Sequence, residues 1–349
     1  MNVALITVGV MMIIATALPL LPSDSWWIRI WDFPRLQIAV ILALTAIALL
    51  SLSAISDLFS SLLLGLLLVC FVYQMYMMYP YTVLARKQVQ QATKSAKESR
   101  VSLLFANVLM ENRDARRLMA IVRKADPDII LTVETDSWWQ AQLKEFEKTH
   151  PFTVQQPQDN TYGMLLYSRL ELLDAQVKFL VQDDVPSIHG RVKLASGQEV
   201  AIHCLHPRPP FPTEVERSTE RDAELVIVGR DVKKEDDPEI VFGDLNDVAW
   251  SRTTTLFQHI SGLLDPRIGR GFYNTFHARY PLIRFPLDHF FSSRHFRLVD
   301  FRRLDYFGSD HFPVFIALSY EPDAVREQEE LHASESEQEE AGEKIEEAA

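Results

Sequence analysis

Residues 240–246 read Ile-Val-Phe-Gly-Asp-Leu-Asn, and this stretch decides the fold class of the larger part of the chain. A short apolar run of this kind is typical of a buried β-strand, and here it leads directly into Asp244 and Asn246. Taken alone, the last four residues also fit a plain aspartate turn before a helix that begins near Ser251. The choice between these interpretations depends on whether the pattern recurs.

Five other apolar runs end in, or lead into, side chains that bind metals or move protons. Those side chains are Asn107 after residues 103–106, Glu134 after 129–133, His206 after 200–205, Asp288 after 283–287, and Asp310 with His311 before 313–318. Polar groups at strand ends can converge at the mouth of a sheet, where hard oxygen ligands suit Mg²⁺ or Mn²⁺. Each signal alone is more often a solvated surface group, but the ordered combination seldom arises by chance.

Residues 101–320 alternate these strands with helical patterns. Helices are predicted over 114–125, 137–148 and 213–232, with strand-like runs between and after them. This arrangement predicts an α/β domain in which two sheets are flanked by helices, and about 220 residues are enough to bury a full core. Two cysteines without a CxxC partner exclude a disulfide framework and a cysteine-rich zinc site.

The motif pattern of residues 100–320 resembles that of the endonuclease/exonuclease/phosphatase superfamily, and within it that of bacterial membrane-anchored members. The matching positions are Asn107, Glu134, His206, 243–246, Asp288 and 309–311. The superfamily includes pancreatic-type deoxyribonucleases, abasic-site endonucleases, inositol polyphosphate phosphatases and bacterial sphingomyelinases. The resemblance implies a four-layered α/β sandwich, with two packed mixed β-sheets flanked by helices.

The resemblance also implies a divalent metal, Mg²⁺ or Mn²⁺, and side chains that hold it. Glu134 would bind the metal, with Asp310 and Asn107 as further candidates. Asn107 and Asn246 would orient the phosphate and the metal-bound waters. An amide can donate hydrogen bonds there without adding negative charge beside a phosphate.

Four further residues would perform the proton chemistry that the resemblance implies. Asp244 would position or deprotonate the attacking water, while Asp288 would pair with His311, which would contact the phosphate. His206 matches the histidine that lies across the phosphate in the deoxyribonuclease and sphingomyelinase branches. Asp244 and His311 both remain candidates for the general base.

Substrate contacts are predicted from three side chains and one biased segment. Arg208 lies in the rigid loop after His206, Tyr162 follows a turn before a strand, and Phe276 lies among arginines and aromatics that lead to Asp288. Residues 252–303 contain nine arginines and only three acids. Such mixtures can cradle a phosphate and stack a base or an apolar group; the alternative is a structural loop with solvated arginines.

The first 85 residues contain only five charged side chains and are too apolar for a purely soluble enzyme. Three charge-free runs, 1–21, 36–56 and 58–85, each reach the roughly 20 residues that a membrane span needs. Only Asp57 separates the second run from the third, so a tight hairpin is predicted there. Three spans are favoured over two, and a cleaved signal peptide is disfavoured because a positive n-region is missing.

Basic residues determine the predicted orientation. Arg29 and Arg35 lie between the first two runs, and five more basic residues lie in 86–100, a predicted juxtamembrane helix or linker. With three spans these two stretches lie on the same side of the membrane, so the positive-inside rule places the C-terminal domain in the cytoplasm. The predicted location is therefore the bacterial inner membrane, with a multi-pass anchor. Residues 321–349 carry 12 acids and 2 bases, and are predicted to be disordered.

The function predicted from these features is a membrane-anchored, metal-dependent phosphoesterase that hydrolyses P–O bonds by in-line water attack. A phosphodiesterase or nuclease is slightly favoured over a phospholipid or inositol-phosphate hydrolase. A non-catalytic scaffold that binds phospholigands is the rival from another class, but a decayed site would have lost a core group. The predicted partners are a nucleic acid or a phospholipid head group and the lipid bilayer, with no obligate protein partner.

Overall fold

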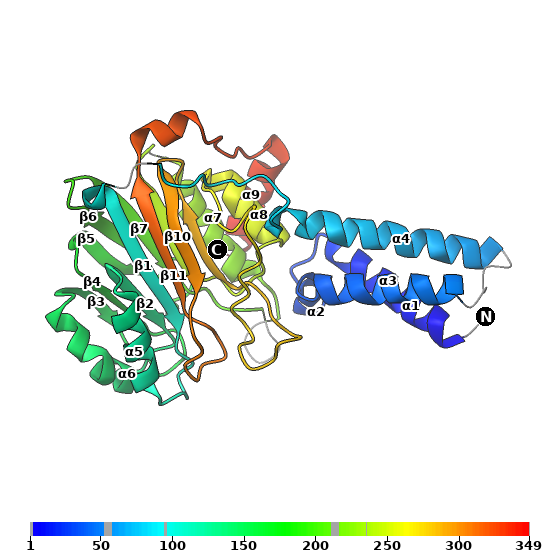
Figure 1. The fold of residues 1–349 in the computed structure, drawn as a ribbon, viewed down its shortest axis with the longest axis horizontal. Coiled ribbons are helices and arrows are strands. Elements are labelled where there is room, and N and C mark those ends of the chain that lie inside the picture. The colour runs from blue at the N-terminus through cyan, green and yellow to red at the C-terminus, as the bar shows by residue number, and fades with distance from the viewer. Residues whose placement is uncertain (1–2, 52–57, 94–95, 211–215, 235, 349) are drawn as a thin grey trace.

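The computed structural model describes residues 3–51, 58–93, 96–210, 216–234 and 236–348. Figure 1 shows a bundle of apolar helices that projects from a larger domain containing two packed β-sheets. The strand order is β10-β11-β1-β2-β4-β3 in one sheet and β5-β6-β7-β8-β9 in the other. Parallel pairs such as β1 with β2 occur beside antiparallel ones such as β8 with β9, so both sheets are mixed.

The first sheet consists of β1 (Arg100–Asn107), β2 (Ile129–Val133), β3 (Phe152–Gln156), β4 (Met164–Ser168), β10 (Phe296–Arg303) and β11 (Val314–Tyr320). The second consists of β5 (Glu171–Lys178), β6 (Ser187–Lys193), β7 (Glu199–Leu205), β8 (Glu239–Asp244) and β9 (Asp288–Ser292).

Helices cover the outer face of each sheet. On the first sheet these are α5 (Ala115–Ala125) and α6 (Ser137–Leu143), and on the second α7 (Thr219–Val232) and α8 (Arg252–Ser261). The predicted four-layered α/β sandwich is therefore confirmed. The predicted start of the third helix was too early: α7 begins after Ser218, and residues 213–215 lie outside the described part.

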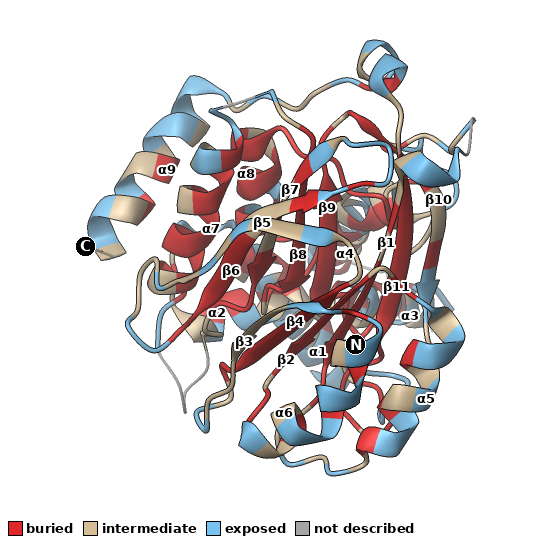
Figure 2. Cartoon of the chain, turned by 90° about the vertical axis from the view of Figure 1, so that its left-hand side faces the viewer, coloured by how far each residue is buried: buried red, intermediate tan, exposed pale blue. Residues whose placement is uncertain are grey.

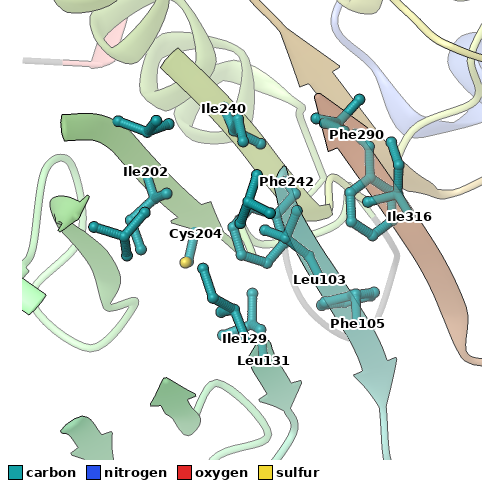
Figure 3. Close-up of a cluster of buried hydrophobic side chains, with 14 of the residues drawn as sticks. Leu103, Phe105, Ile129, Leu131, Ile202, Cys204, Ile240, Phe242, Phe290 and Ile316 are labelled. Carbon is teal, nitrogen blue, oxygen red and sulfur yellow. The ribbon is translucent and has the colours of Figure 1, made fainter. Parts of the chain in front are cut away.

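The core follows from the alternation of side chains along each strand. Successive residues of a strand point to opposite faces, so Leu103 and Phe105 enter the space between the sheets while Leu104 faces the helices. Ile240 and Phe242 meet them from the second sheet, as Figure 3 shows. The outcome is a dry layer between the sheets that fixes where each strand ends.

Within the described residues 3–51 and 58–81, the bundle consists of the α-helices α1 (Val3–Ala17), α2 (Trp26–Arg29), α3 (Arg35–Ser51) and α4 (Leu58–Met78). By length and composition, two segments of this described part can cross a membrane, Val3–Leu20 and Leu58–Tyr81. A third is available if Trp26–Asp32 and Arg35–Ser51, bent by 71°, count as one span. The predicted hairpin at Asp57 lies outside the described residues.

The segment after the bundle differs from the predicted juxtamembrane helix or linker. Residues 90–92 run beside β10, where Ala92 N donates to Leu298 O and Leu298 N donates to Gln90 O, and a short 3-10 helix follows at Lys97–Ser99. Val89 is fully buried in the core between the sheets. A single apolar residue within a polar stretch thus ties this segment to the domain.

The acidic C-terminal segment was predicted to be disordered, and the structure instead contains helix α9 (Glu335–Ala348) there. Ala341 is fully buried against Val226, Leu256 and Ile260 of α7 and α8. Figure 2 shows that α9 lies beside these two helices with mainly its outer side exposed. The prediction failed because the acids lie on the solvent side or meet bases, while a few small and apolar residues make the contact.

A buried group of charges joins the bundle, the domain and α9. Lys344 Nζ lies 2.7 Å from Asp222 and 3.2 Å from Asp24, which precedes α2. Asp222 also accepts from Arg221, and Asp24 lies 3.7 Å from Arg29. Because each carboxylate has two basic partners, the charges compensate one another in a water-poor setting.

We therefore predict that Lys344→Met destabilises the whole protein. Removing the shared cation leaves Asp222 with Arg221 alone and Asp24 with the more distant Arg29, and the loss of the buried pairs should cost about 3 kcal/mol in the free energy of unfolding. In detergent solution the melting temperature should fall by several degrees. The matched control is Glu346→Ala on the exposed side of the same helix, which should change little; equal melting temperatures for both variants would contradict the prediction.

Candidate active site

The polar side chains at the strand ends meet because they continue the inward face of the core. Asn107 has the same parity as Phe105 on β1, and Asp244 has the same parity as Phe242 on β8. Asp288 is the direct cross-strand partner of Asp244. The sequence motifs therefore converge at one end of the layer between the sheets, as the pattern of strand ends predicts.

His311 occupies the centre of this cluster. Its Nδ1 lies 3.1 Å from both oxygens of Asp288, and its Nε2 lies 3.5 Å from Oδ2 of Asp244. All three side chains are buried. Burial alone would lower the pKa of His311, but the carboxylates of Asp288 and Asp244 outweigh it and raise this pKa to about 10. The ring is therefore an imidazolium at physiological pH.

Asn107 links two carboxylates of the cluster. Its Nδ2 donates to Oε1 of Glu134 at 2.7 Å and to Oδ2 of Asp244 at 3.1 Å, while its Oδ1 accepts from the backbone N–H of Leu109. Burial raises the pKa of Glu134 to about 7, against the opposing effect of this hydrogen bond. Glu134 also has a φ of 59°, a left-handed conformation that costs free energy and is common at functional sites.

The Gly-Asp-Leu-Asn turn holds Asp244 and Asn246 in place. Asn246 has a φ of 52°, and its backbone N–H donates to Oδ1 of Asp244 at 2.9 Å. Its side-chain amide donates to the carbonyl of Pro207 at 3.0 Å. Gly243 is required because a Cβ there would lie 1.9 Å from the carbonyl oxygen of Leu205. Burial raises the pKa of Asp244, although the nearby His311 opposes this.

His206 is buried close enough to Asp244 for the two charges to interact, and its ring is neutral. Burial lowers its pKa to about 4, and its Nδ1 is buried without a hydrogen-bond partner in the described part of the chain. Its ring lies 5.5 Å from the ring of Tyr162. Arg208 stacks on Tyr162 at 5.0 Å and pairs with Asp184 at 2.6 Å, so its charge is already engaged. Tyr162 thus contacts His206, and Arg208 contacts Tyr162.

The remaining predicted residues also reach the cluster. The ring of Phe276 lies 5.0 Å from that of His311, and Asp310 lines the same cavity as Glu134 and His311. Ser309, which the sequence analysis did not single out, donates to the carbonyl of Asn107 at 2.8 Å and accepts from His311 N at 3.0 Å. The sequence feature that could have identified Ser309 is its position directly before Asp310 and His311.

Two groups of side chains in the cluster are candidates for a metal site. Asp244, Asp288 and His311 place one ligand atom each within 4.8 Å of one another. Both nitrogens of His311 already face carboxylates, however, and a protonated ring cannot bind a metal. Glu134 and Asp310 offer hard oxygen ligands in the cavity, and the raised pKa of Glu134 is what a buried carboxylate shows without a cation beside it. The donor chemistry therefore fits Mg²⁺ or Mn²⁺ at Glu134 and Asp310, with Asn107 supporting Glu134 through its NH₂ group.

The arginine-rich segment serves the structure in part. Arg267 is fully buried, binds Asp265 at 2.7 Å, and donates to the backbone of Asp288 and to Nδ1 of His289. It therefore supports the strand that carries Asp288 rather than meeting a ligand. This favours the structural interpretation for Arg267, whereas Arg270 and Arg302 line a separate surface groove.

A cavity of about 530 Å³ lies in front of the cluster. Its polar end contains Glu134, Asp244 and His311, and its far wall contains Trp26 and Phe33 from the junction with the bundle. The sequence analysis gave Trp26 and Phe33 no part in the site. Only the tertiary structure brings residues 26–34 in front of the strand ends.

Comparisons with known proteins agree with this arrangement. A sequence profile described as the Endonuclease/Exonuclease/phosphatase family matches residues 104–311. Among curated proteins no match is found. The fold resembles a humanized D. rerio TDP2 (15% identity, TM-score 0.52, covering 63% of this chain and 99% of that one). It also resembles an endonuclease/exonuclease/phosphatase from Beutenbergia cavernae (17% identity, TM-score 0.52, covering 64% of this chain and 72% of that one). A third similar structure is the human Nocturnin catalytic domain with a bound sulfate (14% identity, TM-score 0.53, covering 69% of this chain and 99% of that one).

The profile match covers more than half of the chain and includes every strand end that contributes to the cluster. With the sandwich fold and the converging motifs, it shows that this chain belongs to the endonuclease/exonuclease/phosphatase family of phosphate-ester hydrolases.

Proposed function

We propose that the chain is a membrane-anchored, divalent-metal-dependent hydrolase of phosphodiesters. The observation that carries this proposal is the ring of His311, held by Asp288 and Asp244 in the same cavity as the carboxylate of Glu134. With its raised pKa this ring would offer a positive charge to a phosphoryl oxygen, next to carboxylates that would bind a metal. A metal held at Glu134 and Asp310 would supply charge neutralisation and a template for the phosphoryl group.

The side chains divide the remaining tasks. Asp244 accepts hydrogen bonds from Asn107 and from the backbone N–H of Asn246, and it would orient the attacking water. Nδ1 of His311 is held by Asp288 at 3.1 Å, so Nε2, which lies 3.5 Å from Asp244, is the nitrogen that would donate to the phosphoryl oxygen. Neutral His206 lies near Asp244 and is suited to a second phosphate contact or to proton transfer.

The nuclease interpretation has one support outside the chain. A D. rerio TDP2 structure of similar fold (17% identity, TM-score 0.51) is described as a complex with a single strand DNA product. That statement concerns TDP2, and at this identity the likeness concerns the fold alone. A nucleic acid is accordingly one substrate class to be tested, and a phospholipid head group is the other.

The first prediction concerns the metal and Glu134. Glu134→Gln removes a charge with little change in shape, so hydrolysis of bis(p-nitrophenyl) phosphate in Mn²⁺ or Mg²⁺ should fall by about 10²-fold or more. Mn²⁺ should raise the melting temperature of the wild type but not of the variant. Glu171→Gln, at an exposed position on β5, is the matched control.

A readout in EDTA separates metal binding from a structural role. The folded-state pKa of Glu134 is raised, so its ionised form costs stability as the pH rises from about 4.5 through about 7. At pH 8 without metal, Glu134→Gln should be at least as stable as the wild type. Unchanged turnover in saturating metal, or a metal-induced shift that survives the substitution, would remove Glu134 from the metal site.

The second prediction concerns Asp288 and His311, which we expect to act as one unit. Asp288→Asn and His311→Ala should each lose most of the activity, and the double variant should lose little more than the worse single one. Removing the carboxylate should also lower the pKa of His311. Turnover of Asp288→Asn should therefore decline above about pH 8, where the wild type, with a pKa of about 10, keeps its imidazolium. Additive losses in turnover would show that the two residues act separately.

The third prediction concerns the membrane. The apolar helices should keep the full chain with the membrane fraction during alkaline extraction, and a reporter fused after Ala349 should give a cytoplasmic signal because the basic stretches flank the domain. Release of the chain by alkali would contradict the spanning helices, and a periplasmic signal would reverse the proposed orientation.

A further inference from the structure

The cavity at the cluster has two chemically different ends. Glu134, Asp244 and His311 form the polar end, as described above. The rest of the lining is largely apolar and comes mainly from two segments, residues 26–34 at the base of the bundle and residues 283–287 before β9; Pro209, Pro210 and Phe276 complete it. A volume of about 530 Å³ is enough for a phosphate head group together with part of a hydrocarbon chain.

The apolar wall is fixed to the domain. The rings of Phe33 and Phe285 meet edge to face at 5.5 Å, which joins the two segments directly. Trp250 Nε1 donates to the carbonyl of Asp32 at 2.7 Å from a buried position. The wall is therefore part of the resting structure, and a ligand does not have to assemble it.

The outer edge of this wall is an exposed apolar loop at residues 280–283. Tyr280 is 57% exposed, Leu282 82% and Ile283 54%. Gln37, in the first turn of α3, donates through Nε2 to the carbonyl of Leu282 at 2.7 Å. The loop tip thus lies level with the start of a helix that belongs to the apolar bundle. With Arg279 and Arg284 on either side, it has the composition of a segment that enters a membrane interface.

The charge of the cavity lining favours one class of ligand. Among the described lining residues, Arg29 is the one arginine or lysine, and it lies 3.7 Å from Asp24 and 3.9 Å from Asp32. A nucleic acid strand needs several free cations along its backbone. A lipid needs a single phosphate site and an apolar surface for its chain, and the cavity offers both.

We infer that this site takes phosphodiesters that carry hydrocarbon chains, drawn from the membrane surface, an inference that rests on the proposed function. The phosphate lies at the His311 end, and the chain lies along the wall that contains Ile30, Phe33 and Ile283. Water adds its oxygen to phosphorus, the ester oxygen opposite leaves with a proton, and the products are an alcohol and a phosphate monoester.

The test uses the full chain in dodecyl maltoside and n-alkyl phosphates as inhibitors of bis(p-nitrophenyl) phosphate hydrolysis. Each methylene that leaves water strengthens binding by up to about fourfold. We expect the inhibition constant to fall by at least 50-fold from butyl to dodecyl phosphate. In Ile30→Gln and Ile283→Gln, whose side chains are partly exposed, the ratio of the two constants should shrink at least fivefold.

The matched control is Phe152→Gln, an exposed apolar residue at the first position of β3, opposite to the end that carries the cluster. Inhibitor that partitions into detergent affects this variant and the wild type equally, so the ratio of the butyl and dodecyl phosphate inhibition constants should stay at its wild-type value. A second measurement compares kcat/KM for phosphatidylglycerol, phosphatidylcholine and phosphatidylethanolamine with that for oligothymidylate. At least one lipid should exceed the oligonucleotide by tenfold.

The outcomes separate the inference from the function on which it rests. Absence of metal-dependent hydrolysis of bis(p-nitrophenyl) phosphate by the wild type would refute the proposed function, and the inference with it. Hydrolysis with inhibition constants that do not depend on chain length, or that respond equally to all three substitutions, would overturn the inference alone. A higher kcat/KM for oligothymidylate than for every lipid would also overturn the inference while leaving the proposed function intact, and it would assign the site to nucleic acid.

Discussion

The site depends on one interaction, the buried imidazolium of His311 between the carboxylates of Asp288 and Asp244. Two carboxylates that face each other across β8 and β9 would repel strongly in a water-poor layer. The positive ring offsets that repulsion, and Asn107 offsets part of the next one by donating to both Asp244 and Glu134. What remains is a shortage of positive charge beside Glu134, and burial there raises the pKa of this carboxyl to about 7.

The sequence predicts this part of the molecule well because each reactive residue lies at the end of its own apolar strand. Strand parity then fixes the face: Asn107 follows Phe105 and Asp244 follows Phe242 into the space between the sheets. No such rule exists for contacts between distant segments. The tryptophan-rich residues 26–34 fit a membrane interface by composition, and only the packing of the bundle against Trp250 and Phe285 turns them into a wall of the cavity.

Composition also misled where a few residues outweigh the average. Twelve acids in 29 residues predict a chain that cannot bury a core, yet Ala341 and Lys344 are enough to hold α9 on α7 and α8. Lys344 succeeds because Asp222 and Asp24 are already buried and need a cation. Val89 is a second case, since one buried apolar side chain determines the path of a stretch that otherwise reads as a solvated linker.

Both segments restrain the bundle relative to the domain, which bears on the membrane anchoring that we propose. A free linker would let the domain rotate away from the bilayer. Instead, Val89 fixes the exit from α4, Trp250 holds the backbone at Asp32, and Lys344 binds the start of α2 to α7. With its orientation restrained at three points, the cavity keeps its apolar wall toward the bundle. For the lipid phosphodiester that we propose as substrate, this arrangement would reduce the search for the His311 end from three dimensions to the two of the membrane surface.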